Sequence, residues 1–396
     1  MKIVITGASG FLGTRLVHFL ARIGHQLLLV GRDDARLRAL FPDQLSYSYA
    51  DASPELLCGY EACIHMATRN SDVGGSLLEY QETNVELLRD FCDILLQANV
   101  SRHIYVSSIL AEENGRSFYA KTKWQAECLI QSIAQSVPNW QLTILRPAFI
   151  QTLPYRGKLS LLNRFPTVVS EHAFQIVSAI RPVASLDDVL QTIEHALAGA
   201  LPVNEGPILL TNRQKGNRFY SLVRLLCDYT FVFAVLCFGW LFPIFFLLVK
   251  LDSPGPAIFS QKRVGKDGKL FMCYKFRSMR VGTQDVPTHE LPPLTVTKIG
   301  QFLRKTKIDE LPQIWNILRR DMSLVGPRPC LPTQDKLLLC RKKLGVLNVL
   351  PGLTGYAQVN KVDMSDPERL AAIDNEYINR RSLILDLKIV LKTAFG

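Results

Sequence analysis

The feature that most constrains this chain is an uncharged run from Tyr229 to Val249. Its 21 residues, rising about 1.5 Å each, would span about 31 Å as a helix, enough to cross the apolar layer of a bilayer. Pro243 lies inside the run, where it removes a backbone hydrogen bond and bends a helix. Lys and Arg flank both ends of the run, and such flanks favour the cytoplasmic side. A bent, re-entrant helix at 228–250 satisfies both flanks; a straight spanning helix and a buried core helix stay open as alternatives.

Charge and cysteine content narrow the class of protein. The formal net charge is +11, which suits an anionic membrane or phosphate-bearing substrates. The sequence has neither zinc-finger spacing nor an aromatic-basic RNA motif, so we expect no nucleic-acid partner. Nine cysteines occur without CxxC pairs, which indicates reduced thiols rather than a disulfide framework. The N-terminal MKIVITGASG is typical of a buried strand and a glycine turn, and we do not expect a signal peptide there.

The chain length predicts two domains, because 396 residues exceed one ordinary hydrophobic core. Up to about residue 150, short apolar runs alternate with helical patterns, which predicts a Rossmann-like, doubly wound parallel sheet in an α/β fold. The polar, basic stretch TNRQKGNR predicts a linker. The expected parts are an N-terminal domain at 1–212, a linker at 213–227, the membrane helix at 228–250 and a small, helix-rich α/β domain at 251–396.

A glycine-rich turn follows the first expected strand. In TGASGFLG, Gly7, Gly10 and Gly13 stand between this strand and a helix. Glycines allow the backbone to approach a pyrophosphate, and the helix N-terminus favours its charge. The second strand ends at Arg32 and Asp33, where an arginine accepts the 2′-phosphate of NADP and an acid holds the ribose of NAD. Arg32 comes first, so the sequence favours NADP(H), with NAD(H) left open.

A second group of residues suits proton transfer. In YAKTKWQAE, Tyr119 and Lys123 are four residues apart, on one face of a helix. A nearby ammonium lowers the pKa of a phenol, which can then exchange a proton with a substrate carbonyl. Ser108, at the end of the strand IYVSS, can hold the same oxygen. An ordinary amphipathic helix is the simpler interpretation of the Tyr-Lys spacing alone, but together with the glycine turn it indicates an active site.

The adjacent acids Asp309 and Glu310 precede Pro312, which predicts a helix start with Asp309 as its N-cap. Neighbouring residues on a helix do not face each other, so the carboxylates suit different tasks. One can attack phosphorus as a nucleophile, and the other can hold Mg²⁺. On these two residues alone, a solvated helix cap is the simpler interpretation.

The N-terminal motifs resemble those of the extended short-chain dehydrogenase/reductases, a family of nucleotide-sugar epimerases, dehydratases and 4-ketoreductases. The resemblance covers about residues 1–200, and the sequence VSSI…YAKTKWQAE is most similar to that of members that act on UDP-sugars. It implies that Asp51 contacts adenine. We expect NADPH-dependent reduction of a UDP-4-keto-6-deoxy-N-acetylhexosamine; a 4-epimerase and a non-catalytic nucleotide-binding module stay open.

Three C-terminal stretches, which include KIDELPQIWNILRRDMSLVGPRP and PGLTGYAQV, resemble the bacterial sugar transferases, which are monotopic polyprenyl-phosphate phosphoglycosyl transferases. The resemblance covers about residues 222–396. It implies that Asp309 is the nucleophile and Glu310 the Mg²⁺ ligand. It also implies a set of nucleotide and phosphate contacts: Lys275, Arg277, Arg304, Pro327, Arg328 and Pro329.

The resemblance also places Asp374 and Tyr377 in a further family motif, and Lys307 stands where a Ser or Thr is common. The final segment, RSLILDLKIVLKTAFG, is apolar on one side with Lys388 and Lys392 among the apolar residues, which suits a helix at the membrane interface. Packing on the domain core is the other interpretation of this segment.

Together these features predict a two-domain enzyme on the cytoplasmic face of a bacterial inner membrane. Its C-terminal domain would move a phosphosugar from a UDP-sugar to undecaprenyl phosphate and release UMP, an early step of O-antigen or capsule synthesis. The partners are then a UDP-sugar, the polyprenyl phosphate and membrane lipid; homo-oligomerisation stays open. A membrane-anchored oxidoreductase with an inert tail is a more distant interpretation.

Overall fold

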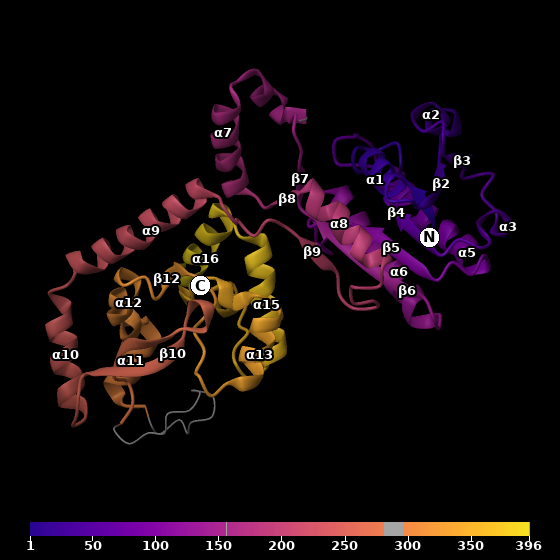
Figure 1. The fold of residues 1–396 in the computed structure, drawn as a ribbon. Helices are drawn as coiled ribbons and strands as arrows, with labels where there is room; N and C mark the ends of the chain where they lie inside the picture. Colours follow the sequence, from indigo (N-terminus) through magenta and orange to yellow (C-terminus); the bar gives the residue numbers. More distant parts are fainter. Residues whose placement is uncertain (156, 281–295, 396) are drawn as a thin grey trace. The chain divides into compact units, whose positions relative to one another are not determined.

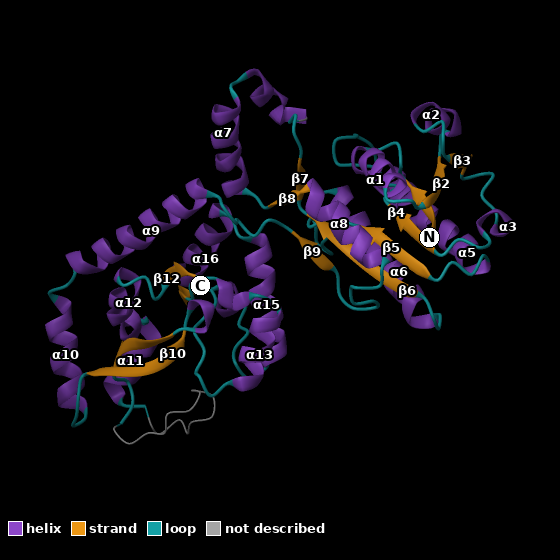
Figure 2. Ribbon diagram, viewed as in Figure 1, coloured by secondary structure: helices purple, strands orange, loops and turns teal. Residues whose placement is uncertain are grey.

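The computed structural model describes residues 1–155, 157–280 and 296–395. The chain forms two compact units (Figures 1 and 2). The N-terminal unit comprises Met1–Arg164 and Val183–Asn212, and the second unit comprises Phe165–Pro182 and the chain from Arg213 onward. The stretch 165–182, assigned from sequence to the N-terminal domain, therefore packs with the second unit.

The N-terminal unit is built on a seven-stranded sheet in the order β3-β2-β1-β4-β5-β6-β9, and all of its strand pairs are parallel. Its strands are β1 Lys2–Thr6, β2 Gln26–Gly31, β3 Leu45–Ser48, β4 Ala62–His65, β5 Arg102–Val106, β6 Gln141–Pro147 and β9 Ile208–Leu210. The strand order reverses at β1 and β4, the kind of place where such sheets bind nucleotides. Two short strands between β6 and β9 in the chain, β7 Phe149–Gln151 and β8 Val183–Ser185, form a separate parallel pair.

Helices cover both faces of the sheet, as the strand-helix alternation predicts (Figure 1). One core lies under α1 and α8, and the other lies under α3, α5 and α6. The helices of this unit are α1 Phe11–Arg22, α2 Asp34–Leu40, α3 Pro54–Leu57, α4 Leu77–Gln81, a π-helical turn Glu82–Glu86, α5 Leu87–Gln97, α6 Phe118–Ser136, a 3₁₀ segment Gly157–Arg164 and α8 Leu186–Leu197. The predicted doubly wound α/β fold is confirmed.

Two apolar helices open the main part of the second unit. α9, Arg218–Cys237, is long and apolar enough to cross a membrane, and most of its surface is not buried in the protein. α10 is Leu241–Asp252, and the chain changes direction between the two helices (Figure 1). The break falls at residues 238–240 rather than at Pro243, which lies in the first turn of α10, where proline is tolerated. Residues 218–227, predicted as linker, are part of α9.

The rest of this unit is small, helix-rich and α/β, as predicted. Its strands form an antiparallel hairpin, β10 Ile258–Val264 with β11 Leu270–Phe276, and a parallel pair, β12 Ser323–Val325 with β13 Gly352–Thr354. Its helices are α7 Thr167–Ile180, α11 Lys298–Thr306, a 3₁₀ helix Ile308–Gln313, α12 Ile314–Leu318, α13 Asp335–Lys343, α14 Tyr356–Val359, α15 Pro367–Arg380 and α16 Leu383–Phe395, with 3₁₀ turns at Lys266–Gly268 and Val346–Asn348.

Candidate active sites

The acidic pair lies on a short 3₁₀ helix, Ile308–Gln313, between α11 and α12. Lys307 adopts the left-handed conformation, with φ 59° and ψ 14°, and so ends α11 and begins the 3₁₀ helix. The predicted N-cap role of Asp309 is wrong, because the residue lies inside the helix and Lys307 occupies the cap position. The left-handed residue thus separates α11 from the short helix that carries both carboxylates.

Glu310 is held by two cations from distant parts of the chain. Its Oε1 accepts a hydrogen bond of 2.6 Å from Nη2 of Arg328 and lies 4.0 Å from Nζ of Lys275. Burial alone would raise the pKa of Glu310, but the charges of Arg328 and Lys275 outweigh it and lower that pKa. Glu310 is therefore an ionised, ion-paired carboxylate.

Asp309 is 8% exposed. Burial, reinforced by the negative charge of Glu310, raises the pKa of Asp309 to about 6, while Lys275, Arg304 and Arg328 pull it downward. Two adjacent carboxylates thus have opposite shifts, because one is paired and the other is desolvated. Asp309 is ionised at neutral pH yet poorly solvated, a combination that suits a nucleophile.

The two arginines predicted as further phosphate contacts differ in their surroundings. Arg304 donates from Nε to Oγ of Ser278 at 2.9 Å, and its charge acts on Asp309. Arg277 instead donates to backbone carbonyls at the end of α10, those of Val249, Ser253 and Pro254. Arg277 caps these carbonyls, which a helix end leaves without partners. The structure therefore brings Lys275, Arg304 and Arg328 to the carboxylates and turns Arg277 toward α10.

Backbone packing and a hydrogen bond from Arg341 hold the Pro327-Arg328-Pro329 turn in place. Its neighbour Gly326 packs against Gly352, and a Cβ on either glycine would overlap backbone atoms of the facing segment. Nη1 of Arg341 donates to the carbonyl of Arg328 at 2.8 Å, and Nη2 of Arg341 pairs with Asp374 at 2.6 Å. Asp374, singled out from its motif, thus acts through Arg341 on the backbone of Arg328. Sequence reasoning missed Arg341, because nothing distinguishes it from its basic neighbours in CRKK.

Tyr377, from the same motif, ties α15 to α16 and α9. Its hydroxyl donates to Asp386 at 2.8 Å, and Tyr220 of α9 donates to the other oxygen of Asp386 at 2.8 Å. Arg224 of α9 lies 3.7 Å from the same carboxylate. Tyr377 therefore belongs to a buried polar network at the start of α9 rather than to the acidic turn.

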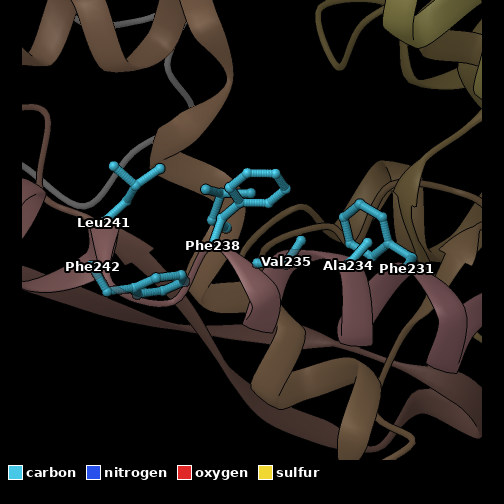
Figure 3. Close-up of a pocket in the computed structure, with 7 residues that line it drawn as sticks. Phe231, Ala234, Val235, Phe238, Leu241 and Phe242 are labelled. Atoms are coloured by element: carbon cyan, nitrogen blue, oxygen red, sulfur yellow. The ribbon is translucent and has the colours of Figure 1, made fainter.

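Two apolar hollows border the residues that follow Glu310. One, of about 300 Å³, lies in the bend between α9 and α10 (Figure 3). Its lining residues are Phe231, Ala234, Val235, Phe238, Leu241, Phe242 and Leu311. The other, of about 690 Å³, includes Pro312, Trp315, Phe246 and Tyr274 in its lining. Asp309 and Pro312 share one side of the 3₁₀ helix, since residues i and i+3 eclipse there.

The acidic turn has limited capacity to hold a metal by itself. Within the described ranges, no group of three His, Cys, Asp or Glu side chains gathers as a metal site. Mg²⁺ is commonly bound by one or two carboxylates together with substrate phosphate oxygens. Glu310 fits this pattern as the single carboxylate, with the phosphate oxygens of a bound diphosphate as further ligands.

In the N-terminal unit, the glycine turn forms a close backbone cradle. Gly7 has φ 74°, and a Cβ there would lie 2.6 Å from the backbone nitrogen of Ala67. A Cβ on Gly13 would overlap Gly7 and Ala8, whereas Gly10 has more space. Only glycine permits this approach of strand, turn and α1, so these residues fit the diphosphate of a dinucleotide.

Three residues are expected to contact the adenosine part of the cofactor, and two of them accept hydrogen bonds from residues close in sequence. Arg32 is exposed just beyond β2, and Asp33 caps α2 by accepting from the backbone N–H of Arg36 at 2.9 Å. Asp51 accepts from Oγ of Ser48 at 2.6 Å. Asp33 is engaged in the cap, which leaves it less available to hold the ribose of NAD. This favours Arg32 as a contact for the 2′-phosphate of NADP.

Lys123 makes its hydrogen bonds to β5. Nζ of Lys123 donates to the hydroxyl of Tyr105 at 3.2 Å and to the carbonyl of Val106 at 2.9 Å. Burial lowers the pKa of Lys123 to about 7. Burial also raises the pKa of Tyr119, although a hydrogen bond with Ser108 partly opposes this. The predicted lowering of the Tyr119 pKa by Lys123 is wrong, because burial raises that pKa and Nζ of Lys123 donates to Tyr105 and Val106 of β5.

Two family models match different parts of the chain. The model of the bacterial sugar transferases matches residues 219–396, and that of the NAD dependent epimerase/dehydratase family matches residues 3–151. The chain is 39% identical over 176 residues to the uncharacterized sugar transferase EpsL of Bacillus subtilis, covering 44% of this chain and 86% of that protein.

Two further relatives are much longer than the matched region. The UDP-glucose:undecaprenyl-phosphate glucose-1-phosphate transferase of Escherichia coli is 43% identical over 158 residues, which are 38% of this chain and 34% of that protein. The galactosyl transferase CpsE of Streptococcus agalactiae is 37% identical over 207 residues, 48% and 45% of the two chains. The chain thus spans less than half the length of these two relatives.

Among solved structures, the chain is similar to a short-chain dehydrogenase/reductase superfamily protein from Agrobacterium tumefaciens. The identity is 19% and the TM-score is 0.43, over 53% of this chain and 77% of that chain.

Proposed function

Since the chain belongs to the bacterial sugar transferase family, we propose that its second unit transfers a sugar phosphate from a UDP-sugar to undecaprenyl phosphate. The main support for this proposal is that the two adjacent carboxylates, Asp309 and Glu310, have opposite pKa shifts. Asp309 is buried with its pKa raised to about 6, while the adjacent Glu310 is paired with Arg328. The relative from Escherichia coli bears this activity in its name.

The proposed reaction has two steps. A carboxylate oxygen of Asp309 attacks the sugar-proximal phosphorus, and the bond between that phosphorus and the bridging oxygen breaks, so that UMP leaves. The lipid phosphate then attacks the same phosphorus and displaces Asp309, giving polyprenyl-diphospho-sugar. Lys275, Arg304 and Arg328 lie where they can offset the charge of the donor diphosphate.

Glu310 would hold Mg²⁺ together with the diphosphate. The ion would supply further charge neutralisation there. Arg328, which already positions Glu310, would keep this carboxylate ionised and oriented whether or not phosphate is present. The neighbouring turn residues Pro327 and Pro329 would support the nucleotide.

The acceptor is an amphiphile, and the surroundings of the turn suit it. The hollow lined by Pro312, Phe246 and Trp315 is apolar and adjoins the side of the 3₁₀ helix that carries Asp309. We place the first isoprene units of the lipid there, with its phosphate toward Asp309. α9 and α10 would hold the unit in the membrane as a helix pair that re-enters the cytoplasmic face.

UMP release by the purified full-length chain tests this function. With Mg²⁺, undecaprenyl phosphate and a panel of UDP-N-acetylhexosamines, we expect UMP, and we expect Asp309→Asn to abolish turnover while UDP-sugar binding persists. Asp335→Asn, on the exposed first turn of α13, is the matched control and should leave the rate unchanged. Release of UDP, or substantial turnover by Asp309→Asn, would contradict the nucleophile assignment.

For the N-terminal unit we propose NAD(P)H-dependent reduction of a UDP-4-keto-6-deoxy-N-acetylhexosamine, with NADPH favoured by Arg32. NAD(P)H supplies the hydride when bound. The raised pKa of Tyr119 keeps its hydroxyl protonated at neutral pH, so Tyr119 can give a proton to the carbonyl oxygen, with Ser108 beside it. Reduction requires this proton, whereas oxidation would require the tyrosinate.

The surroundings of Lys123 favour a second candidate, a nucleotide-binding module without turnover, because Nζ of Lys123 donates to Tyr105 and to the carbonyl of Val106 in β5. NADPH oxidation with the keto sugar separates the two. We expect oxidation that Tyr119→Phe removes, with cofactor binding retained. Binding without oxidation would establish the module, and interconversion of UDP-sugars without net oxidation would establish an epimerase.

A further inference from the structure

We propose that α7 is a lipid-facing helix of the transferase unit and that its exposed apolar side rests on an anionic bilayer. This inference builds on the proposed membrane embedding of that unit. In the chain, α7 lies between β7 and β8, which pair with each other in the N-terminal unit. α7 itself lies outside the part of the chain that the sugar transferase model matches.

Buried polar contacts fix α7 to the start of α9. Nε2 of Gln214 donates to the carbonyl of Ser178 at 2.6 Å. Nδ2 of Asn217, the N-cap residue of α9, donates to the carbonyl of Gln175 at 3.0 Å and to Oγ of Ser178 at 2.9 Å. Both donating side chains are buried, so α7 is an integral part of this unit. α7 also packs against α16.

α7 exposes a broad apolar face and buries polar side chains among apolar ones, which is unusual for a helix in water. Its buried positions are Ser170, Phe174, Ser178 and Ala179, so two of the four are polar, whereas its most exposed apolar side chains are 43% to 65% exposed. These exposed residues are Val168, Val169, Ile176 and Ile180. At 100° per residue they fall within one arc of about 120°, which also contains His172. A helix facing water shows the opposite distribution.

The two helices that α7 contacts have the same arrangement. α9 turns Tyr220 and Asp228 inward and exposes Leu226 and Phe233. α16 buries Asp386 and exposes an apolar row of Ile384, Leu387, Leu391 and Phe395. Three mutually packed helices that bury polar groups and expose large apolar ones form a surface suited to hydrocarbon rather than water.

Charge identifies a bilayer rather than a second copy of the chain as the occupant. Arg181 follows α7 directly, and the exposed Lys388 and Lys392 adjoin the apolar row of α16. Basic residues beside an apolar helix face are the pattern of attachment to anionic lipid. A second copy would bring the same positive charges together, which disfavours self-association through this face.

A photo-crosslinking experiment on the full chain in vesicles of phosphatidylglycerol and phosphatidylethanolamine tests the proposal. The crosslinker p-benzoylphenylalanine is introduced in place of Ile176, and mass spectrometry follows the adducts. The reference positions are Phe233 on α9, which tests the embedding of the transferase unit itself, and Leu78, an exposed residue of α4 in the N-terminal unit.

We expect a mass increase of one phospholipid at position 176, comparable in yield to that at 233, with no lipid adduct at 78. Lipid adducts at 233 but not at 176 would overturn the role of α7 and leave the proposed function intact. A covalent dimer from position 176 would instead show that a second copy covers α7. Absence of lipid adducts at both 176 and 233 would contradict the membrane embedding on which this inference rests.

Discussion

Two pairs of titratable residues that are close in sequence, Asp309-Glu310 and Tyr119-Lys123, have very different surroundings in the folded chain. In the acidic turn, adjacent carboxylates are separated electrostatically, because Arg328 and Lys275 pair with Glu310 and leave Asp309 buried beside it. In α6, Tyr119 and Lys123 share a helix face, yet the ammonium goes to β5 and the phenol to Ser108. Proximity in sequence therefore predicts joint chemistry only when the surrounding packing brings the partners together.

The largest effect is expected at the cation that defines the first site. Arg328→Ala leaves Glu310 buried without its principal partner, and loss of one member of a buried pair typically costs about 3–5 kcal/mol. Because Arg328 is about a third exposed, we expect a smaller loss of stability. Since the same guanidinium would also face the donor diphosphate, we expect kcat/KM to fall by roughly 30-fold, which corresponds to about 2 kcal/mol.

Steady-state UMP release measures this effect. Arg328→Lys is the matched variant, and it should retain part of the activity because it keeps the charge and loses the planar fork. Equal activity of Arg328→Ala and the unmodified chain would show that Glu310 does not depend on this ion pair.

The second prediction concerns the protonation of Asp309. A carboxylate nucleophile must be ionised, and its pKa is raised to about 6. kcat/KM for UMP release should be level above pH 7 and should fall about tenfold per pH unit well below pH 6. A profile that stays level down to pH 5, in a chain that remains folded, would contradict either the assignment or the burial of Asp309.

The third prediction concerns the buried ammonium of the second site. Burial lowers the pKa of Lys123 from 10.5 to about 7. Between these two values the unfolded chain binds one more proton than the folded chain, so stability rises with pH, by about 1.4 kcal/mol per pH unit at most. From pH 7.5 to 9 we expect an increase of about 2 kcal/mol in the unfolding free energy of the N-terminal unit.

Denaturant titrations at several pH values measure this slope, and Lys123→Met is the control. The methionine fills a similar volume without a titratable group, so its pH slope should be smaller by the contribution of Lys123. Identical slopes for the two proteins would show that Lys123 is charged in the folded state.

The smallest effect is expected at Lys307. Its left-handed backbone favours glycine, and the favoured conformation should offset the lost hydrogen bond from Nζ to the carbonyl of Thr393. Lys307→Gly should change the unfolding free energy by less than about 1 kcal/mol and keep the transferase rate. Lys307→Val, which disfavours this conformation, should be the less stable variant in thermal unfolding; the reverse order would contradict the role of the left-handed residue.

The sequence by itself determined the local features of this protein. Strand-helix alternation, the turn at Gly7 and Gly13, and the uncharged run from Tyr229 each depend on periodicity or on residues close in the chain. For the same reason the sequence predicted that Asp309 and Glu310 would take different roles, since neighbours on a helix point in different directions.

Only the tertiary structure decided which distant groups meet. It brings Arg328 to Glu310, turns Arg277 to the end of α10, buries Lys123 against β5 and packs α7 with the transferase unit. These outcomes depend on the long-range packing of strands and helices, to which local spacing does not refer. A charged side chain settles where burial and available partners together lower its free energy, and those partners exist only once the fold has formed.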